Sequence, residues 1–494
     1  MGRAHGPLYG YGAGMRRSAA ALLGLLLLGA AAAPLGVRAN GIGHFDEVWV
    51  AHSGTAYGAS GSSCRHPHFV ADGSDDQDEI SWALEDTNPN GTVHLCPGIY
   101  RFGDNIDLHS NDDVTIDGAG MGRTILDGGA NYRRDVRLSS TSDIIYTYGS
   151  GELTLSNLTV QNAGGGYGAL YLDGPLVVDH VRFYHNASSY EGGAIWGGEV
   201  TVIASQFVAN AAGDGDAGGG AISASDLHVT GSTFTGNRGD GRGGAILAST
   251  IDVTGSTFSL SHALGGGAIA ADDGVITLSI FKGNRSEGRG GAVYVEGSLN
   301  VATTAFRRNR SVGASSGGTS CDGGGGAVFA YDAAVTSSDF VGNSADAGSC
   351  ADLDLEFWSH GAGVGGGLFV EHSSSVMDAR FSSNRAAFLG GGAAVFGEPN
   401  FDGLAFVRNV SGGWGGALSI FGEACSVTGG DWGFHALAFR VNSAATDGGA
   451  IAFSGADEDA DELTALLAAA RFANNHDLAA PYAPNEVELG CPIP

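Results

Sequence analysis

Apolar residues recur along this chain in short runs in which apolar and polar positions alternate. In one typical stretch, residues 243–246 read Gly-Gly-Ala-Ile, residues 251–253 read Ile-Asp-Val and residues 256–258 read Ser-Thr-Phe. Alternation with a period of two predicts β-strands, because successive side chains of a strand point to opposite sides. Gly, Ser, Asp and Asn separate the runs, and no repeat contains an apolar pattern long enough for a helix. The pattern therefore predicts many short strands joined by turns.

The runs belong to a repeat that is mostly 23 to 27 residues long and carries two signatures. A Phe-x-x-Asn signature alternates with a Gly-Gly-Ala-like signature, and a degenerate copy, Phe258-Ser-Leu-Ser261, fills the one gap in the first series. The Phe-x-x-Asn copies start at Phe183, Phe207, Phe234, Phe281, Phe306, Phe340, Phe381, Phe406, Phe439 and Phe472. The residues assigned to the position after the glycines are Ala194, Ala221, Ala245, Ala268, Ala292, Ala327, Leu368, Ala393, Ala417 and Ala450.

A repeat of this length predicts stacked coils of about three short strands each, because one such unit cannot bury its apolar side alone. Stacking places equivalent residues above one another, so Phe should stack on Phe inside and Asn should bond to Asn at a corner. The paired glycines suit either a corner with positive φ or a wall that approaches the core closely. A flexible glycine-rich linker is the less favoured alternative, because it needs no Phe at a fixed phase.

Four segments are expected along the chain. Residues 1–39 have the composition of a secretory signal, with Arg16 and Arg17 before an apolar run and a small-residue cleavage site at Val37-Arg38-Ala39. A membrane anchor is the alternative, although the apolar run is short for one. Residues 40–92 form a leader and a cap, with a short helix over 74–86 that Ser74 can cap. Residues 93–475 form the stacked coils, and residues 476–494 cap the other end.

The alternating Gly-Gly-Ala-Ile and Phe-x-x-Asn units resemble the repeats of polymorphic outer membrane proteins and of the wider pectin-lyase-like group. The cap helix followed by Pro97-Gly98-Ile99-Tyr100 resembles the opening of many pectin-lyase-like chains. The resemblance implies an all-β fold, a right-handed parallel β-helix with an N-terminal capping helix. For function it implies adhesion at a cell surface on one side and polysaccharide cleavage on the other, because the same fold serves both.

Charge narrows the set of partners. The chain has 24 basic and 53 acidic residues, and removal of residues 1–39 takes away four Arg, which leaves 20 − 53 = −33. This charge argues against nucleic acid and anionic membranes, and against direct binding of polyuronates unless a cation bridges.

Six cysteines in an exported chain predict three disulfides, for which the sequence alone allows fifteen pairings. Cys64 and Cys96 are isolated near the N-terminus, so we expect them to pair. Cys321 and Cys350 lie in successive long repeats and would join two stacked loop insertions. Cys425 and Cys491 remain and would tie the last coil to the tail.

Acid–base chemistry would need ionisable groups that converge from neighbouring coils. The residues assigned two places after the motif Ala carry no charge; they are Trp196, Ser223, Leu247, Ala270, Tyr294, Phe329, Val370, Val395, Ser419 and Ala452. Acids gather in turns instead, as at Asp272-Asp273. Val178-Asp179-His180 resembles an element of pectate lyases, but an ordinary strand explains it better.

Calcium is the one cofactor for which the sequence offers ligands. Asp75, Asp76, Asp78 and Glu79 could bind it, although an acidic first helical turn explains them equally well. The turn Asp214-Gly215-Asp216 is a second candidate.

Two functions follow from these observations. The leading hypothesis is a secreted or surface-associated, non-enzymatic β-helix protein, adhesin-like or a structural scaffold. We expect its binding partner to be an extracellular polysaccharide or a cell-surface protein, and we expect no nucleic-acid binding. After removal of the signal, no membrane-spanning segment is expected. The alternative is a polysaccharide lyase or glycoside hydrolase acting on an extracellular polysaccharide, which a groove with at least three charged side chains from adjacent coils would favour.

The long repeats between Asn309 and Gly366 are the expected place for a binding site, because insertions on one face of a solenoid often carry function. The candidate binding residues there are Asp352, Asp354, Glu356, Trp358 and His360.

Overall fold

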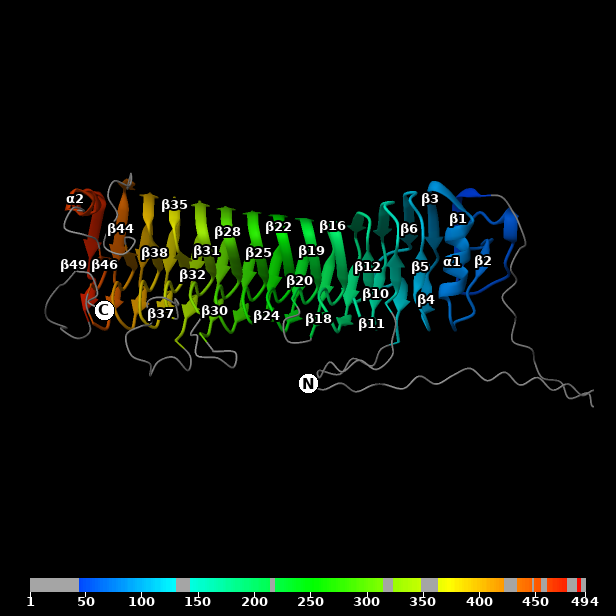
Figure 1. Cartoon of the computed structure of the whole chain (residues 1–494), viewed down its shortest axis with the longest axis horizontal. Helices are drawn as coiled ribbons and strands as arrows, with labels where there is room; N and C mark the ends of the chain where they lie inside the picture. Colours follow the sequence, from blue (N-terminus) through cyan, green and yellow to red (C-terminus); the bar gives the residue numbers. More distant parts are fainter. Residues whose placement is uncertain are drawn as a thin grey trace, which may run out of the picture. The chain divides into compact units, whose positions relative to one another are not determined.

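Parallel strands dominate the computed structural model of this protein, which describes residues 44–129, 143–213, 218–313, 323–347, 363–421, 433–446, 448–454, 460–477 and 487–489. The strands stack along one axis as successive coils (Figure 1). One typical coil contains β19 (Ile222–Thr230), β20 (Thr233–Thr235) and β21 (Arg238–Gly239), and the next coil starts with β22 (Ile246–Thr254). Among the described residues these coils form three parallel sheets of 23, 14 and 12 strands. The predicted right-handed parallel β-helix is confirmed.

The 14-stranded sheet carries the Phe positions and follows the chain in order from β4 (Gly98–Arg101) to β47 (Ala470–Ala473). Its register pairs each signature Phe with the Phe of the next coil, as in Phe207 with Phe234 and Phe234 with Phe258. The 12-stranded sheet runs from β11 (Gly164–Gly165) to β48 (His476–Asp477). The largest sheet contains the strands that follow the paired glycines, such as β19 and β22.

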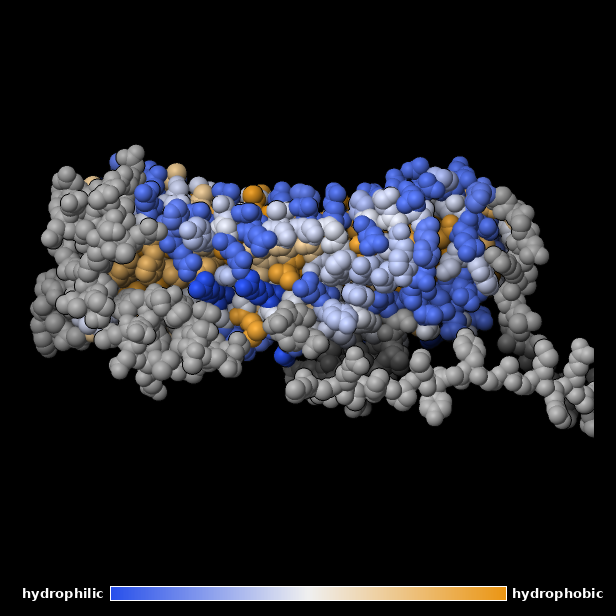
Figure 2. Space-filling model, in the orientation of Figure 1, coloured by the Kyte–Doolittle hydropathy of each residue, from blue (hydrophilic) through white to orange (hydrophobic). Residues whose placement is uncertain are grey.

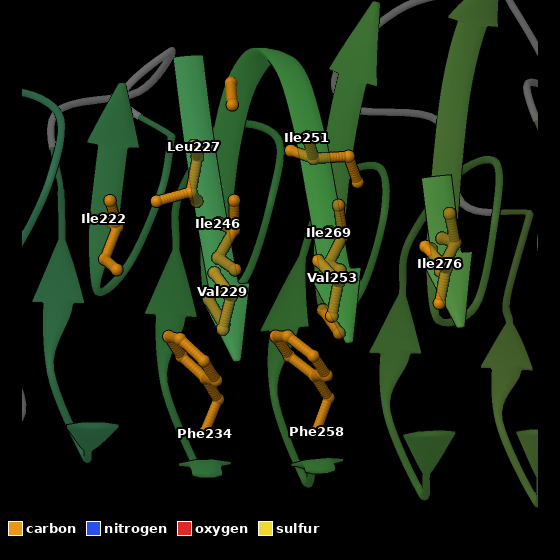
Figure 3. Packing of buried hydrophobic residues seen from close by; sticks show 14 of the residues in the cluster. Ile222, Leu227, Val229, Phe234, Ile246, Ile251, Val253, Phe258, Ile269 and Ile276 are labelled. Atoms are coloured by element: carbon orange, nitrogen blue, oxygen red, sulfur yellow. The ribbon is translucent and has the colours of Figure 1, made fainter. Parts of the chain in front are cut away.

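The interior Phe rings form one continuous stack from Phe183 to Phe472. Neighbouring ring centroids are 4.6 to 5.3 Å apart and the planes differ by 2° to 16°. Figure 3 shows Phe234 and Phe258 in adjacent coils, with Val229 and Val253 packed beside them. Phe207, Phe234 and Phe281 are completely buried, so the predicted common interior is confirmed.

Asn side chains form a second buried ladder at the corner that follows each Phe. Asn343 shows the pattern, because its Nδ2 donates to Asn384 Oδ1 at 3.0 Å and to the Phe306 carbonyl oxygen at 3.0 Å. The ladder is interrupted at Ser261, whose hydroxyl is too short to continue it. Within the described structure, the buried Ser261 Oγ has no hydrogen-bond partner.

The two glycines of the signature serve different purposes. Gly243 has φ of +71°, a left-handed backbone conformation that favours glycine. A Cβ on Gly244 would lie 2.2 Å from the carbonyl oxygen of Gly267 in the next coil, so the second glycine permits a close approach of the backbones. Both of the expected reasons for the paired glycines are therefore present.

Two assignments in the glycine series are wrong by one residue. The register pairs Val328 with Leu368, and Leu368 with Ala393, so these residues occupy the position of Ile246 rather than that of Ala245. Gly367 and Gly392 fill the Ala position instead. The outward positions of these two coils therefore belong to Phe369 and Ala394, and not to Val370 and Val395, which are buried. The run of three glycines hid the shift.

The N-terminal cap contains α1 (Gln77–Glu85), within the predicted helix at 74–86. Its N-cap is Asp76 and not Ser74, whose hydroxyl donates to Asp72 instead. α1 lies against β1 (Phe45–Ala51), β3 (Thr87–Leu95) and β5 (Ile106–Leu108). Because β1 pairs with β3, strands of the largest sheet begin before residue 93. At the other end, α2 (Ala460–Ala469) lies near β43 (Gly433–His435).

Candidate functional site

The residues that the sequence nominated for binding lie outside the described part of the chain. These are Asp352, Asp354, Glu356, Trp358 and His360, and the same holds for Asp214, Asp216, Cys321, Cys350, Cys425 and Cys491. The first predicted disulfide is present, since Cys64 and Cys96 are bonded with their Cα atoms 5.5 Å apart. It joins the segment between β1 and β2 (Phe69–Val70) to the end of β3.

The acids at the start of α1 have structural partners. The buried Asp76 accepts hydrogen bonds from the backbone N–H groups of Gly73 and Arg101, both at 2.7 Å, and so ties the cap to the first coil. Burial raises the pKa of Glu79 to about 7, and the charges of neighbouring acids add to this. In the described ranges, no group of three or more His, Cys, Asp or Glu side chains is placed to hold a metal ion.

The remaining acidic candidates do not assemble a reaction centre. Asp273 accepts a hydrogen bond from the backbone of Ser298 in the next coil. His180 Nδ1 lies 2.6 Å from Asp179 Oδ1, and both side chains are largely exposed. Asp179 is the last residue of β13 (Leu176–Asp179), whose inward residues are buried, and His180 follows the strand with φ of +55°. The expected strand therefore covers Val178 and Asp179.

A hollow of about 450 Å³ lies over the later part of the largest sheet, between β28 (Val293–Ala302) and β39 (Glu398–Asp402). Hydroxyl and amide groups line it, together with two carboxylates, Asp332 and Glu398. Asp332 already accepts hydrogen bonds from Ser373 and contacts His372 at 2.9 Å, and these contacts lower its pKa despite partial burial. This groove holds fewer charged groups than the three that would favour an enzyme.

One group of charged residues joins coils that lie two apart in the stack, and the sequence did not reveal it. Arg242 lies over the Tyr294 ring at 5.1 Å and forms an ion pair with Glu296. Tyr294 Oη also lies 3.0 Å from a Glu296 carboxylate oxygen. Two coils on, Arg289 lies 4.6 Å from the Phe329 ring centroid and 3.5 Å from Glu371.

A different cluster lies near the start of the outward row of the largest sheet, and it is aromatic and only partly buried. Tyr146 in β8 (Ile145–Thr147), Tyr171 in β12 (Leu170–Leu172) and Trp196 in β16 (Ile195–Ile203) occupy equivalent positions in three successive coils. Their ring centroids are 4.2 and 4.6 Å apart and their planes are nearly parallel. Ile145, Leu170 and Ile195 precede them in sequence and point into the core, so the alternation of the strand turns the rings outward.

Further rings extend this row sideways. Tyr167 crosses Tyr171 edge-on at 4.7 Å and stacks on Tyr190 at 5.2 Å. Tyr148 lies 4.4 Å from Tyr146 and stacks on His109 at 4.6 Å. We name this cluster the aromatic platform; its members are His109, Tyr146, Tyr148, Tyr167, Tyr171, Tyr190 and Trp196.

Carboxylates surround the aromatic platform. Asp107 pairs in register with Tyr146, and Asp173 lies two residues after Tyr171. Asp143 accepts a hydrogen bond from the Tyr167 backbone, and burial raises the pKa of its carboxyl to about 6. Partial burial and the hydrogen bond to Tyr171 raise the pKa of Tyr146 to about 12, so this phenol keeps its proton at neutral pH.

A second hollow, of about 530 Å³, adjoins the aromatic platform. It lies between α1 and β5, and Asp107 and His109 belong both to its lining and to the platform surface. Glu85 and Asp112 add further negative charge to its wall. The platform and the hollow together form a continuous candidate surface for ligand binding.

Sequence reasoning placed Trp196 at a repeated, uncharged strand position but missed its aromatic neighbours. The signal was present, because Tyr146, Tyr171 and Trp196 are each 25 residues apart and each follows a buried aliphatic residue. The coils of Tyr146 and Tyr171 lack the full repeat signatures, so their register was not visible in the sequence.

Comparisons with known proteins identify the repeat. Residues 231–249 and 279–296 match the model of the Chlamydia polymorphic membrane protein repeat, which confirms the resemblance that the signatures indicated. No curated protein matches the chain.

Two solved structures align with the chain at low similarity. One is a PL6 alginate lyase in complex with a trisaccharide, at 13% identity and a TM-score of 0.36, covering 72% of this chain and 85% of the enzyme. The other is a mutant of the PL6 family alginate lyase AlyGC, at 13% identity and a TM-score of 0.35. That alignment covers 83% of this chain and 52% of the enzyme.

The described residues contain no helix that combines the length and the apolar character needed to cross a membrane.

Proposed function

We propose that this protein is a secreted or surface-associated, non-enzymatic β-helix protein that adheres to an extracellular carbohydrate. The observation that carries the proposal is the exposed aromatic platform, which offers binding groups without an acid–base pair directed at a common point. General acid–base catalysis needs two ionisable groups within reach of one scissile bond. The match to a membrane-protein repeat and the predicted signal at residues 1–39 support a surface or secreted location.

The experiment starts from the chain beginning at Asn40, incubated with a panel of polysaccharides with and without calcium. Retention of the protein on at least one polysaccharide, with no new reducing ends and no unsaturated uronides, is the expected result. Cleavage of any member of the panel would overturn the non-enzymatic part of the proposal. Expression of the full chain in a secreting host, followed by N-terminal sequencing, tests export and the cleavage site before Asn40.

A carbohydrate-active enzyme is the second candidate, and the cluster of Arg242, Tyr294 and Glu296 is the observation that favours it. A phenol 3.0 Å from a carboxylate and beside an arginine could in principle exchange a proton with a bound sugar. Glu296 already forms an ion pair with Arg242, however, and only 8% of Tyr294 is exposed, which leaves little access for a polymer. If cleavage is observed, its loss in Tyr294→Phe would assign it to this cluster.

A further inference from the structure

Exposure distinguishes the aromatic platform from the interior stack of Phe rings. Tyr148, Tyr167 and Tyr190 are 51%, 37% and 55% exposed, although each contacts another ring of the group. The outward position does not require an aromatic residue, because the same row continues with Ser223, Leu247 and Ala270. Clustered exposed rings on a surface of otherwise interchangeable positions indicate a binding surface.

Ring geometry limits what can bind there. Both faces of Tyr171 are covered, one by Tyr146 and the other by Trp196, so the ring presents its edge and its hydroxyl to solvent. The edge of an aromatic ring carries partial positive charge, whereas its face carries the negative charge that attracts cations. This arrangement favours a ligand rich in oxygen atoms over an organic cation.

Charge limits the ligand further. Asp107, Asp143, Asp173 and Glu191 lie on or beside the aromatic platform. No residue of the platform, or of the lining of the adjoining hollow, is a lysine or arginine in the part of the chain that the structure describes. A polyanion would therefore meet only repulsion, while the carboxylates can accept hydrogen bonds from uncharged hydroxyl groups.

The length of the aromatic platform indicates that its ligand is a polymer rather than a single sugar. The platform spans four coils, from the coil of Asp107 and His109 to that of Trp196. At about 4.8 Å between neighbouring strands, this corresponds to roughly 14 Å along the axis. The hollow of about 530 Å³ continues the surface beyond His109.

We propose that the aromatic platform binds a neutral, hydroxyl-rich polysaccharide that lies along the β-helix axis. Ring edges and phenol hydroxyls contact the sugar oxygen atoms, and the flanking carboxylates accept hydrogen bonds from sugar hydroxyl groups. This inference rests on the proposed adhesion function and specifies its ligand.

The test compares the chain from Asn40 onward with the double variant Tyr171→Ala/Trp196→Ala. Affinity gel electrophoresis and titration calorimetry would use β-glucan, xylan and mannan as neutral probes, alginate and polygalacturonate as anionic probes, and chitosan oligosaccharides as cationic probes. Tyr331→Ala is the matched control, because Tyr331 is an exposed outward tyrosine, 43% accessible and stacked on His372, in another part of the same sheet. Tyr171→Phe keeps the stack and removes only one hydroxyl.

The expected result is binding of at least one neutral polysaccharide with little dependence on salt. Affinity should fall by about tenfold or more in the double variant, fall less in Tyr171→Phe and stay unchanged in Tyr331→Ala. Thermal melting of each variant separates loss of binding from loss of folding.

Three outcomes would overturn the inference. They are equal binding by the double variant and the parent chain, salt-sensitive binding to the anionic or cationic probes alone, and no binding to any probe. None of these outcomes involves cleavage, so they leave the non-enzymatic assignment intact. Cleavage of a probe would instead refute that assignment while leaving the location of the binding surface to be read from the variants.

Discussion

Two ladders of aromatic rings run along this molecule, one inside the β-helix and one outside it. The interior Phe rings lie 4.6 to 5.3 Å apart, and the exterior rings of Tyr146, Tyr171 and Trp196 lie 4.2 to 4.6 Å apart. The same parallel register produces both spacings, because it places equivalent residues of successive coils side by side. The ladders differ in their exposure to solvent: the Phe rings are buried, and the platform rings are half-buried or exposed.

The difference shows where this fold constrains its sequence and where it does not. Inside, every coil from Phe183 to Phe472 supplies a Phe, because a smaller residue would leave a cavity between its neighbours. Outside, the row changes from aromatic to non-aromatic residues after Trp196 and back to aromatic at Tyr294. The exterior is therefore where coils of one architecture can acquire different binding properties.

The exterior also varies along the molecule. Figure 2 shows one face on which hydrophilic residues cover most of the described surface, with a hydrophobic band along the C-terminal half. A separate apolar cluster includes the outward residues Phe329 and Phe369, which are buried, unlike the platform rings. Outward aromatic residues thus pack together in one half of the row and remain accessible in the other.

The largest expected effect comes from emptying one interior position. Phe234→Ala should destabilise the protein by about 3–5 kcal/mol, because the ring is fully buried between two others and the stack cannot collapse around the gap. The exterior counterpart Tyr171→Ala should cost only about 1 kcal/mol, the value of an aromatic contact at a surface. Denaturant unfolding of both variants measures the contrast. Equal losses would mean that the exterior ladder contributes to folding as much as the interior one.

The next effect tests the buried Asn ladder. Asn343→Ala should cost about 3 kcal/mol, because it removes hydrogen bonds to Asn309, Asn384 and the Phe306 carbonyl and leaves buried polar groups without partners. Asn300→Ala is the matched control, since Asn300 is exposed on the outer side of β28. Chemical denaturation of the pair should show a loss only for Asn343→Ala; similar stabilities would contradict the role of the ladder.

Acids divide between inside and outside in the same way as the rings, and Glu79 lies on the buried side of α1. Its pKa is raised from 4.5 to about 7, so the folded state retains a proton that the unfolded state has lost between these values. Stability should therefore fall as pH rises from 4.5 to 7, by at most about 3 kcal/mol for this group. Glu79→Gln should lose that part of the pH dependence. Parallel curves of melting temperature against pH for the two proteins would refute the prediction.

The smallest effect should be a gain in stability. Ser261→Asn should stabilise the protein by about 1 kcal/mol, because an amide at this corner can continue the ladder between Asn237 and Asn284. The backbone at this corner matches that of a coil with Asn in the ladder, since the preceding Leu260 has φ of +57° and Arg308, which precedes Asn309, has φ of +54°. Ser261→Ala, which removes the unpartnered hydroxyl without adding an amide, is the comparison, and unfolding midpoints would rank the three proteins. A destabilised Ser261→Asn would show that the corner has no room for the longer side chain.

The sequence by itself determined the coil. Its period, the Phe and Asn positions and the paired glycines specify one repeating unit, and stacking of identical units follows from the need to bury the apolar side. The helix at residues 77–85 and the bond between Cys64 and Cys96 were also readable, because local spacing suffices for both.

Only the tertiary structure decided which distant residues become neighbours on the outside. The platform joins two coils that lack the full repeat signatures, those of Tyr146 and Tyr171, to the coil of Trp196. It adds Tyr167 and Tyr190 from the turns before the strands. The same dependence on register moved Phe369 into the outward row in place of Val370. Exterior positions are not fixed by packing against a core, so their partners depend on the length of each turn, which becomes visible only when the coils are placed side by side.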